Sequence, residues 1–270
     1  MTGETISILD GSTFIVSDRR GDIRAAPDEP QGLFYRDTRF LSRWVVTVGD
    51  GELDVLSTDE TSYSEAQFFL CPPTGTIYRN PTLSVMRKRM VGDGFHEDLT
   101  LINHAAEPLD LEIRLEAAAD FADLFEVKDA LPKKGELYRS VEAERLVLGY
   151  RRERFVRETH VTSSQPAEYS EEGLRFRLRL EPHSEWSTCL EVGLVTDRPI
   201  AIKYGHGEDT PKPNMRLSLE EWLDQAPQVE CDIDAVEHIY RRSLPTWRPC
   251  ASTPSSSPTP PCPLRECPGS

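Results

Sequence analysis

The acidic residues of the chain are the first candidates for chemistry. Asp120, Asp123 and Glu126 lie close together in one short segment. Glycoside hydrolysis needs one carboxylic acid to protonate the leaving oxygen and a second carboxylate on the opposite side. The chain has 46 Asp and Glu residues, however, so neighbouring acids carry little information. These three alternate with apolar residues, which favours capping and turn bonding over catalysis for this segment.

Tyr35, Arg36, Asp37 and Arg39 form a dense polar cluster between two phenylalanines. An arginine pairs well with a carboxylate, so Arg36 or Arg39 could bind Asp37 or a distant acid. One interpretation is an ion-paired turn that links two strands. The other is an interdomain contact or the rim of a substrate cleft, because connecting loops carry function more often than strands do. The candidate interdomain or cleft-rim contacts are Tyr35, Arg36, Asp37 and Arg39.

The remaining polar motifs favour structural roles. His96 and Asp98 would share one face of a strand, where we expect a hydrogen-bonded pair, since no nucleophile is implied beside them. The six histidines show no metal-ligand spacing, so we expect no metal and no cofactor. Aromatic side chains could stack on sugars, but core packing is the expectation for Trp44, Trp186 and Trp222.

Alternation of apolar and polar residues recurs from Ile6 to about Val195 and predicts antiparallel strands. The predicted hairpin turns are Asp10–Gly11, Gly49–Gly51 and Asp93–Gly94. Strands with one polar face need a second sheet to cover the other, so the sequence predicts a large, supersandwich-like antiparallel β-sandwich, an all-β fold.

The sequence divides into three parts, because the strand-like alternation ends near Val195 and a proline-rich segment begins at Pro245. We assign residues 1–200 to the sandwich domain and residues 201–244 to a loop and helical linker. In the linker, Ser218 and Glu221 form a capping box, and a second helix opens at Asp234. Residues 245–270 are rich in proline and predict a disordered tail.

Net charge and cysteine usage narrow the partners and the compartment. A net charge of −15 repels phosphates and anionic lipids, so we expect no nucleic acid and no membrane as partner. The N-terminus shows neither a basic region nor an apolar run of a signal peptide. Cys71, Cys189 and Cys231 are widely separated, as expected for reduced thiols, and we therefore expect a cytoplasmic protein.

Three segments, residues 32–44, 91–103 and 120–127, resemble in the right order the N-terminal domain of bacterial and archaeal glycogen debranching enzymes of the amylo-alpha-1,6-glucosidase type. The resemblance implies a sandwich that precedes an α/α toroid, in which the catalytic acids lie. It also implies hydrolysis of α-1,6 branch linkages without metal or nucleotide. The chain would then be a non-catalytic accessory domain, with the downstream catalytic domain as partner and α-glucan as a further candidate. The alternative is a stand-alone carbohydrate-binding or interaction module for α-glucans.

The last 26 residues, 245–270, contain eight prolines and three cysteines and keep no hydrophobic period. The spacing of these cysteines is poor for a metal site. A neighbouring reading frame, entered at Pro245, permits Asp-Leu-Ala-Ala-Leu-Arg-Phe-Asp and later Pro-Ala-Ala-Gly-x-Pro-Trp, which resembles the segment that opens the catalytic domain in the family. We therefore hypothesise a frameshift near Leu244 that truncates the protein and makes the tail an out-of-frame product. Resequencing the DNA around the Leu244 codon tests this.

Overall fold

The computed structural model describes residues 5–26, 30–49, 51–62, 64–73, 82–92, 94–129, 131 and 133–196, with scattered positions between 224 and 244. The chain divides into two compact units, Met1–Asn214 and Met215–Ser270. Every named strand lies in the first unit, and the strands form three antiparallel sheets. The prediction of an all-β antiparallel sandwich is therefore confirmed. The proposed limits at residues 200 and 244 fall outside the described residues or among scattered ones, and they stay predictions.

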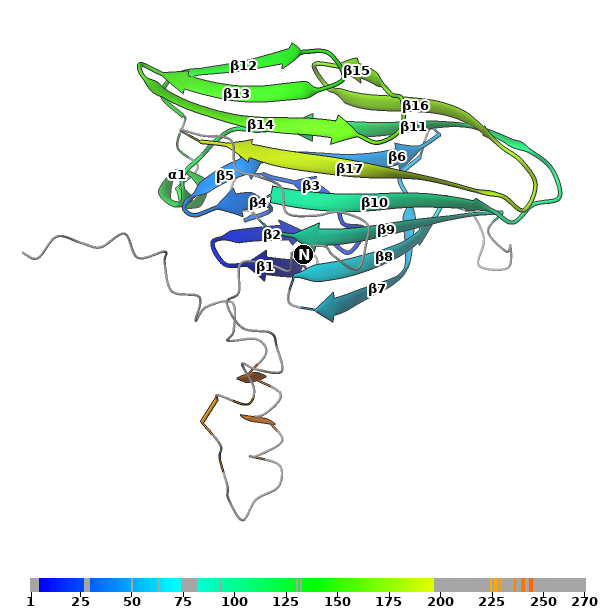
Figure 1. The fold of residues 1–270 in the computed structure, drawn as a ribbon, viewed down its shortest axis with the longest axis horizontal. Helices are drawn as coiled ribbons and strands as arrows, with labels where there is room; N and C mark the ends of the chain where they lie inside the picture. Colours follow the sequence, from blue (N-terminus) through cyan, green and yellow to red (C-terminus); the bar gives the residue numbers. More distant parts are fainter. Residues whose placement is uncertain are drawn as a thin grey trace, which may run out of the picture. The chain divides into compact units, whose positions relative to one another are not determined.

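One layer of the sandwich is an eight-stranded sheet in the order β12-β13-β14-β17-β10-β9-β8-β7. In Figure 1 these strands follow one another from β12 to β7. Their bounds are β7 (Asp54–Ser62), β8 (Glu65–Cys71), β9 (Leu83–Val91), β10 (Gly94–Asn103), β12 (Glu136–Val141), β13 (Leu146–Arg152), β14 (Phe155–Ser163) and β17 (Glu185–Val195).

A five-stranded sheet in the order β15-β16-β11-β6-β3 forms the opposite layer, and a four-stranded sheet in the order β1-β2-β4-β5 lies at one end. The five-stranded sheet contains β3 (Ile23–Arg24), β6 (Arg43–Val48), β11 (Leu109–Ala118), β15 (Glu168–Ser170) and β16 (Gly173–Leu180). The four-stranded sheet contains β1 (Ile6–Asp10), β2 (Thr13–Ser17), β4 (Gly32–Tyr35) and β5 (Thr38–Leu41), and the short helix α1 is Leu124–Lys128.

The core lies between the layers because the strands alternate buried and less buried positions. Strand β9 alternates strictly along its length, and Leu83, Val85 and Val91 are buried there. Residues from all three sheets join one hydrophobic cluster, in which Trp44 and Phe95 pack edge to face with ring centres 4.9 Å apart. Burial of these apolar side chains between the sheets is the main stabilising contribution to such a sandwich.

Two of the three predicted hairpins are confirmed. Strands β1 and β2 pair across Asp10–Gly11, and β9 pairs with β10 across the glycine turn at Gly94. The prediction of the third hairpin, across Gly49–Gly51, is wrong, because its two flanking strands do not pair with each other. Strand β6 pairs with β11 and β3, whereas β7 pairs with β8. Gly49 has a φ of 66°, and its N–H donates to the carbonyl oxygen of Glu112. The turn therefore carries the chain from one layer to the other, which local turn chemistry does not distinguish from a hairpin.

Strand β7 is an edge of the eight-stranded sheet, and its pairing with β8 is irregular. The register shifts between Val55 and Ser57 and again between Asp59 and Ser62. Each shift adds residues to one strand only, as a β-bulge does, and a bulge increases the local twist.

In the second unit, the described residues with helical backbone are Asp224, Val236, Ile239, Tyr240, Ser243 and Leu244. The last five lie in the segment where the sequence predicts a helix from Asp234. The capping box at Ser218 and the whole tail from residue 245 lie outside the described residues. Across the described residues, no helix has the length and apolar character needed to cross a membrane.

Candidate functional site

The side chain of Arg39 joins two of the segments on which the resemblance rests. Its Nε donates to Oδ1 of Asp120 at 3.1 Å, and its Nη2 donates to Oδ2 at 2.5 Å. Its Nη1 donates to the carbonyl oxygen of Gln31 at 3.2 Å. The Arg39 side chain passes close to Gly32, which has a φ of 158°. A Cβ at this position would lie 2.5 Å from Cδ of Arg39, so only glycine leaves room for the arginine. The arginine thus pairs bidentately with a distant acid, one of the two partners that the sequence left open.

Backbone hydrogen bonds fasten the residues after Asp120 to the turn between β4 and β5. The N–H of Arg39 donates to the carbonyl oxygen of Ala122 at 2.8 Å, and the N–H of Leu124 donates to that of Asp37 at 3.0 Å. Phe121 adopts a left-handed φ of 51°, which costs a residue with a side chain about 1–2 kcal/mol. Its buried ring packs edge-on against Phe40, with centroids 5.5 Å apart, and this burial offsets the cost.

The four candidate rim residues occupy different environments. Arg36 and Asp37 are exposed at the turn, Tyr35 is half-buried, and Arg39 is buried. Arg36 has a φ of 55°, its N–H donates to the carbonyl oxygen of Ser12, and its guanidinium lies 5.4 Å from the centre of the Tyr35 ring. Tyr35, Arg36 and Asp37 can therefore meet another surface directly, whereas Arg39 holds the turn in place.

The three neighbouring acids each have a structural partner. Asp120 binds Arg39, and Asp123 accepts from the N–H groups of Phe125 and Glu126 as the N-cap of α1. Glu126 completes a capping box, since its carboxylate accepts from the N–H of Asp123. It also accepts from Nζ of Lys133 at 2.7 Å. Capping and turn bonding are what the alternation with apolar residues predicted for this segment.

Replacing Asp123 by alanine should therefore loosen α1. The substitution removes the acceptor for two amides at the helix start, and loss of such a cap costs about 1 kcal/mol. Urea unfolding followed by circular dichroism measures the change, and hydrogen exchange should be faster at the amides of Phe125 and Glu126. Asp129→Ala is the matched control, because Asp129 lies at the other end of α1 and caps no N-terminal amide. An equal loss in both variants would contradict the capping role.

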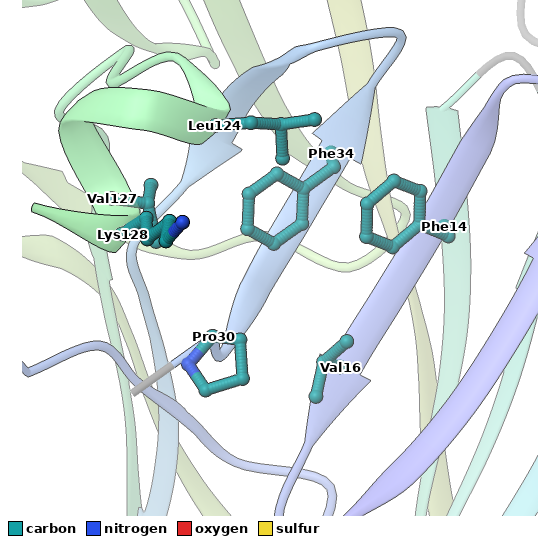
Figure 2. Close-up of a pocket in the computed structure, with 7 residues that line it drawn as sticks. All are labelled: Phe14, Val16, Pro30, Phe34, Leu124, Val127 and Lys128. Carbon is teal, nitrogen blue, oxygen red and sulfur yellow. The ribbon is translucent and has the colours of Figure 1, made fainter. Parts of the chain in front are cut away.

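An apolar pocket of about 350 Å³ lies between α1 and the four-stranded sheet (Figure 2). Phe14 and Phe34 stack on its wall, with ring centres 4.7 Å apart and planes 8° from parallel. The lining residues are Phe14, Val16, Pro30, Phe34, Leu124, Val127 and Lys128. No carboxylate is in this lining, so the pocket suits contact with an apolar group rather than acid–base chemistry.

A buried ionic cluster joins the two layers, and the sequence analysis missed it. Glu97 accepts from Nε of Arg87 at 2.9 Å and from Nε of Arg89 at 2.7 Å. Nη1 of Arg87 also donates to Oδ1 of Asp22 at 2.7 Å, and the indole N–H of Trp44 donates to Glu97 at 3.3 Å. Buried charges of this kind persist only when they are paired and hydrogen-bonded. The cluster therefore fixes how the two sheets face each other.

The other predicted residues lie as follows. Trp44 is fully buried in the core, as predicted. Trp186 packs edge-on against Phe176 with ring centres 5.3 Å apart, and Trp222 lies outside the described residues. His96 and Asp98 form the predicted hydrogen-bonded pair, with Nε2 and Oδ1 2.8 Å apart. The absence of a catalytic residue stays a prediction. His96, Asp98 and Cys189 lie close enough together to hold a metal ion, which the spacing of the histidines did not indicate.

Comparison with solved structures finds distant neighbours. A candidate kojibiose phosphorylase from the human microbiome is 9% identical with a TM-score of 0.48, and the match covers 70% of this chain and 29% of that chain. A candidate aldose 1-epimerase from Escherichia coli K12 is 10% identical with a TM-score of 0.43, and the match covers 72% of this chain and 99% of that chain. The match thus spans less than a third of the phosphorylase.

Comparison with families is more specific. A search among curated proteins finds no match. The model of a family described as the N-terminal domain of (some) glycogen debranching enzymes matches residues 8–191, which include the ion pair between Arg39 and Asp120, the α1 region and the buried ionic cluster. Because this match covers more than half of the chain, the chain belongs to the family of N-terminal domains of glycogen debranching enzymes.

Proposed function

We propose that this chain is a non-catalytic domain that supports hydrolysis of α-1,6 linkages by a downstream helical catalytic domain. The observation that carries the proposal is the exposed apolar surface at α1. Leu124 is 45% exposed, Phe125 is 75% exposed, and Leu131 just beyond the helix is 54% exposed. Apolar side chains that gather at the surface of a folded domain mark an interaction site.

The surroundings of α1 have the composition of a protein interface. Exposed Arg36 and Asp37 lie beside it, because the N–H of Leu124 is bonded to the backbone of Asp37. An apolar centre with a polar rim is the usual arrangement of such surfaces. Family membership supports the same role, since the members are defined as domains of debranching enzymes.

The test is association in trans. The full chain is mixed with the helical catalytic domain of a debranching enzyme whose own N-terminal domain belongs to this family. Sedimentation velocity reports the complex, and glucose release from a branched limit dextrin reports the activity. We expect a complex with higher activity than the catalytic domain alone. We also expect Phe125→Asp to weaken association at least about tenfold, because the substitution places a charge where the complex would bury an aromatic ring.

The matched control is Leu56→Asp, which places the same charge on an exposed apolar residue of β7. Equal weakening by both variants, or no complex at all, would refute the proposal. Affinity electrophoresis in glycogen separates the alternative role as an α-glucan-binding module. Retardation of the chain alone that survives Phe125→Asp would favour that alternative.

A further inference from the structure

Four side chains with metal-binding atoms meet on the outer face of the eight-stranded sheet. Strands β10 and β17 are neighbours, with His96 opposite Glu191 and Asp98 opposite Cys189. Residues two apart on a strand point to the same side, and directly opposite residues lie within side-chain reach. The four residues therefore form a two-by-two array, and the next inward residues, Glu97 and Leu190, point into the core.

Distances within this array are short. Nε2 of His96 lies 2.8 Å from Oδ1 of Asp98, and Nδ1 lies 3.9 Å from Oε1 of Glu191. One ligand atom from each of His96, Asp98 and Cys189 lies within 4.8 Å of the others. His96 is only 1% exposed although it belongs to the outer face, so its ring is shielded from solvent.

The donor set selects the kind of metal. Imidazole nitrogen, thiolate sulfur and carboxylate oxygen are the ligands of Zn²⁺, at about 2.0–2.3 Å from the ion. Hard cations such as Ca²⁺ and Mg²⁺ prefer oxygen ligands alone. Ligand atoms around a tetrahedral ion are roughly 3–4 Å apart at these bond lengths, so small side-chain rotations would close the array onto an ion.

We propose that His96, Asp98 and Cys189 bind a divalent transition-metal ion of the zinc type, with Glu191 beside the fourth position. The ion would tie β10 to β17 in the middle of the sheet. Sequence spacing could not reveal the site, because Cys189 reaches the other ligands only through strand pairing. The inference does not depend on the proposed role in debranching.

A purely hydrogen-bonded cluster is the competing interpretation. Burial, together with Asp98 nearby, raises the pKa of Cys189 to about 11, so the free thiol is protonated at neutral pH. A metal ion must displace that proton to gain the thiolate, as is usual for cysteine ligands. The two interpretations therefore differ in whether a thiolate–metal bond forms.

Titration with Co²⁺ distinguishes them, because tetrahedral cobalt bound to a thiolate gives both visible bands and a near-ultraviolet charge-transfer band. The other thiols of the chain are controlled first. A background variant of the full chain carries Cys231→Ser, Cys250→Ser, Cys262→Ser and Cys267→Ser, which leaves Cys71 and Cys189 as its thiols. Cys71→Ser in this background is the matched control, since Cys71 is a free buried thiol outside the array.

We expect the cobalt spectrum in the background variant and in Cys71→Ser, with Zn²⁺ bleaching it by displacement. Cys189→Ser should abolish the charge-transfer band and weaken binding at least about tenfold, and His96→Gln should weaken it similarly. Cys189→Ser keeps a similar size and a hydroxyl, so its metal-free unfolding midpoint should stay close to that of the background. A missing spectrum in the background variant, or a charge-transfer band that survives Cys189→Ser, would overturn the proposal.

Discussion

Replacing Glu97 by glutamine will lower the free energy of unfolding by roughly 3–5 kcal/mol, the cost of removing one partner from a buried ion pair. Glu97 is fully buried and accepts hydrogen bonds from Arg87, Arg89 and Trp44. A glutamine keeps the shape but brings an NH₂ group toward two guanidinium groups. Asp22 then remains as the carboxylate that binds Arg87, and Arg89 loses its ionic partner.

Urea unfolding at neutral pH measures this loss. The control is Glu112→Gln, because Glu112 also binds arginines, Arg114 and Arg177, but does so on the surface. Exposed ion pairs contribute little, so the control should leave the unfolding midpoint nearly unchanged. Equal midpoints for the two variants would show that the buried cluster does not hold the layers together.

The same carboxylate gives the fold a defined response to acid. Burial opposes the ionisation of Glu97, but the charges of Arg87 and Arg89 outweigh it and hold the pKa of Glu97 below its usual value. A depressed pKa means that the stabilisation is complete above the unfolded-state pKa, about 4.3, and is lost as the pH falls through the folded-state pKa. The difference in unfolding free energy between the wild type and Glu97→Gln should therefore shrink in acid.

Arg39→Met will lower the free energy of unfolding by about 2–3 kcal/mol, less than the roughly 3–5 kcal/mol of a fully buried pair, because one third of the Asp120 side chain is exposed. Methionine fills much of the space but donates no hydrogen bond to Asp120 or to the carbonyl oxygen of Gln31. The segment that leads into α1 then loses its side-chain anchor to β5.

Chemical unfolding gives the loss of stability, and hydrogen exchange at the amide of Leu124 reports whether α1 has loosened from the turn. Arg36→Met is the matched control, since Arg36 is exposed and its guanidinium lies over the ring of Tyr35. If both variants are equally stable, Arg39 does not join the two segments energetically.

Periodicity was sufficient to predict the sandwich but not the ionic cluster within it. Arg87 and Arg89 lie at the same alternate positions of β9 as Leu83, Val85 and Val91, so their side chains point inward. In a sequence, charged residues at alternate positions normally indicate the solvent-facing side of a strand, so these two arginines did not indicate burial. Glu97 alternates in step with the apolar Phe95 and Leu99, and this position could have indicated a buried carboxylate paired with the arginines. The contribution of Asp22 could not be predicted, because Asp22 lies far from these strands in the sequence.

The candidate site was predictable in kind rather than in detail. The bidentate capacity of Arg39 indicated an acid, yet Asp120 lies 81 residues away in sequence, and only the packing of β5 on the α1 segment brings it near. The capping role of Asp123 follows from local sequence, because a capping box is formed within four residues. The turn at Gly49 was misassigned for the converse reason, since its local pattern is that of a hairpin and the partner of each strand is chosen by the sheets.

The irregular outer strand β7 bears on how this domain behaves among many copies of itself. An unpaired edge strand is a template on which another chain can add a strand, and repeated addition leads to amyloid-like fibres. Here Asp54, Asp59 and Glu60 are exposed along β7, and the two register shifts prevent a long flat ladder. Like charges would repel a second copy that approached this edge strand in register. The sheet can therefore be broad without polymerising through β7.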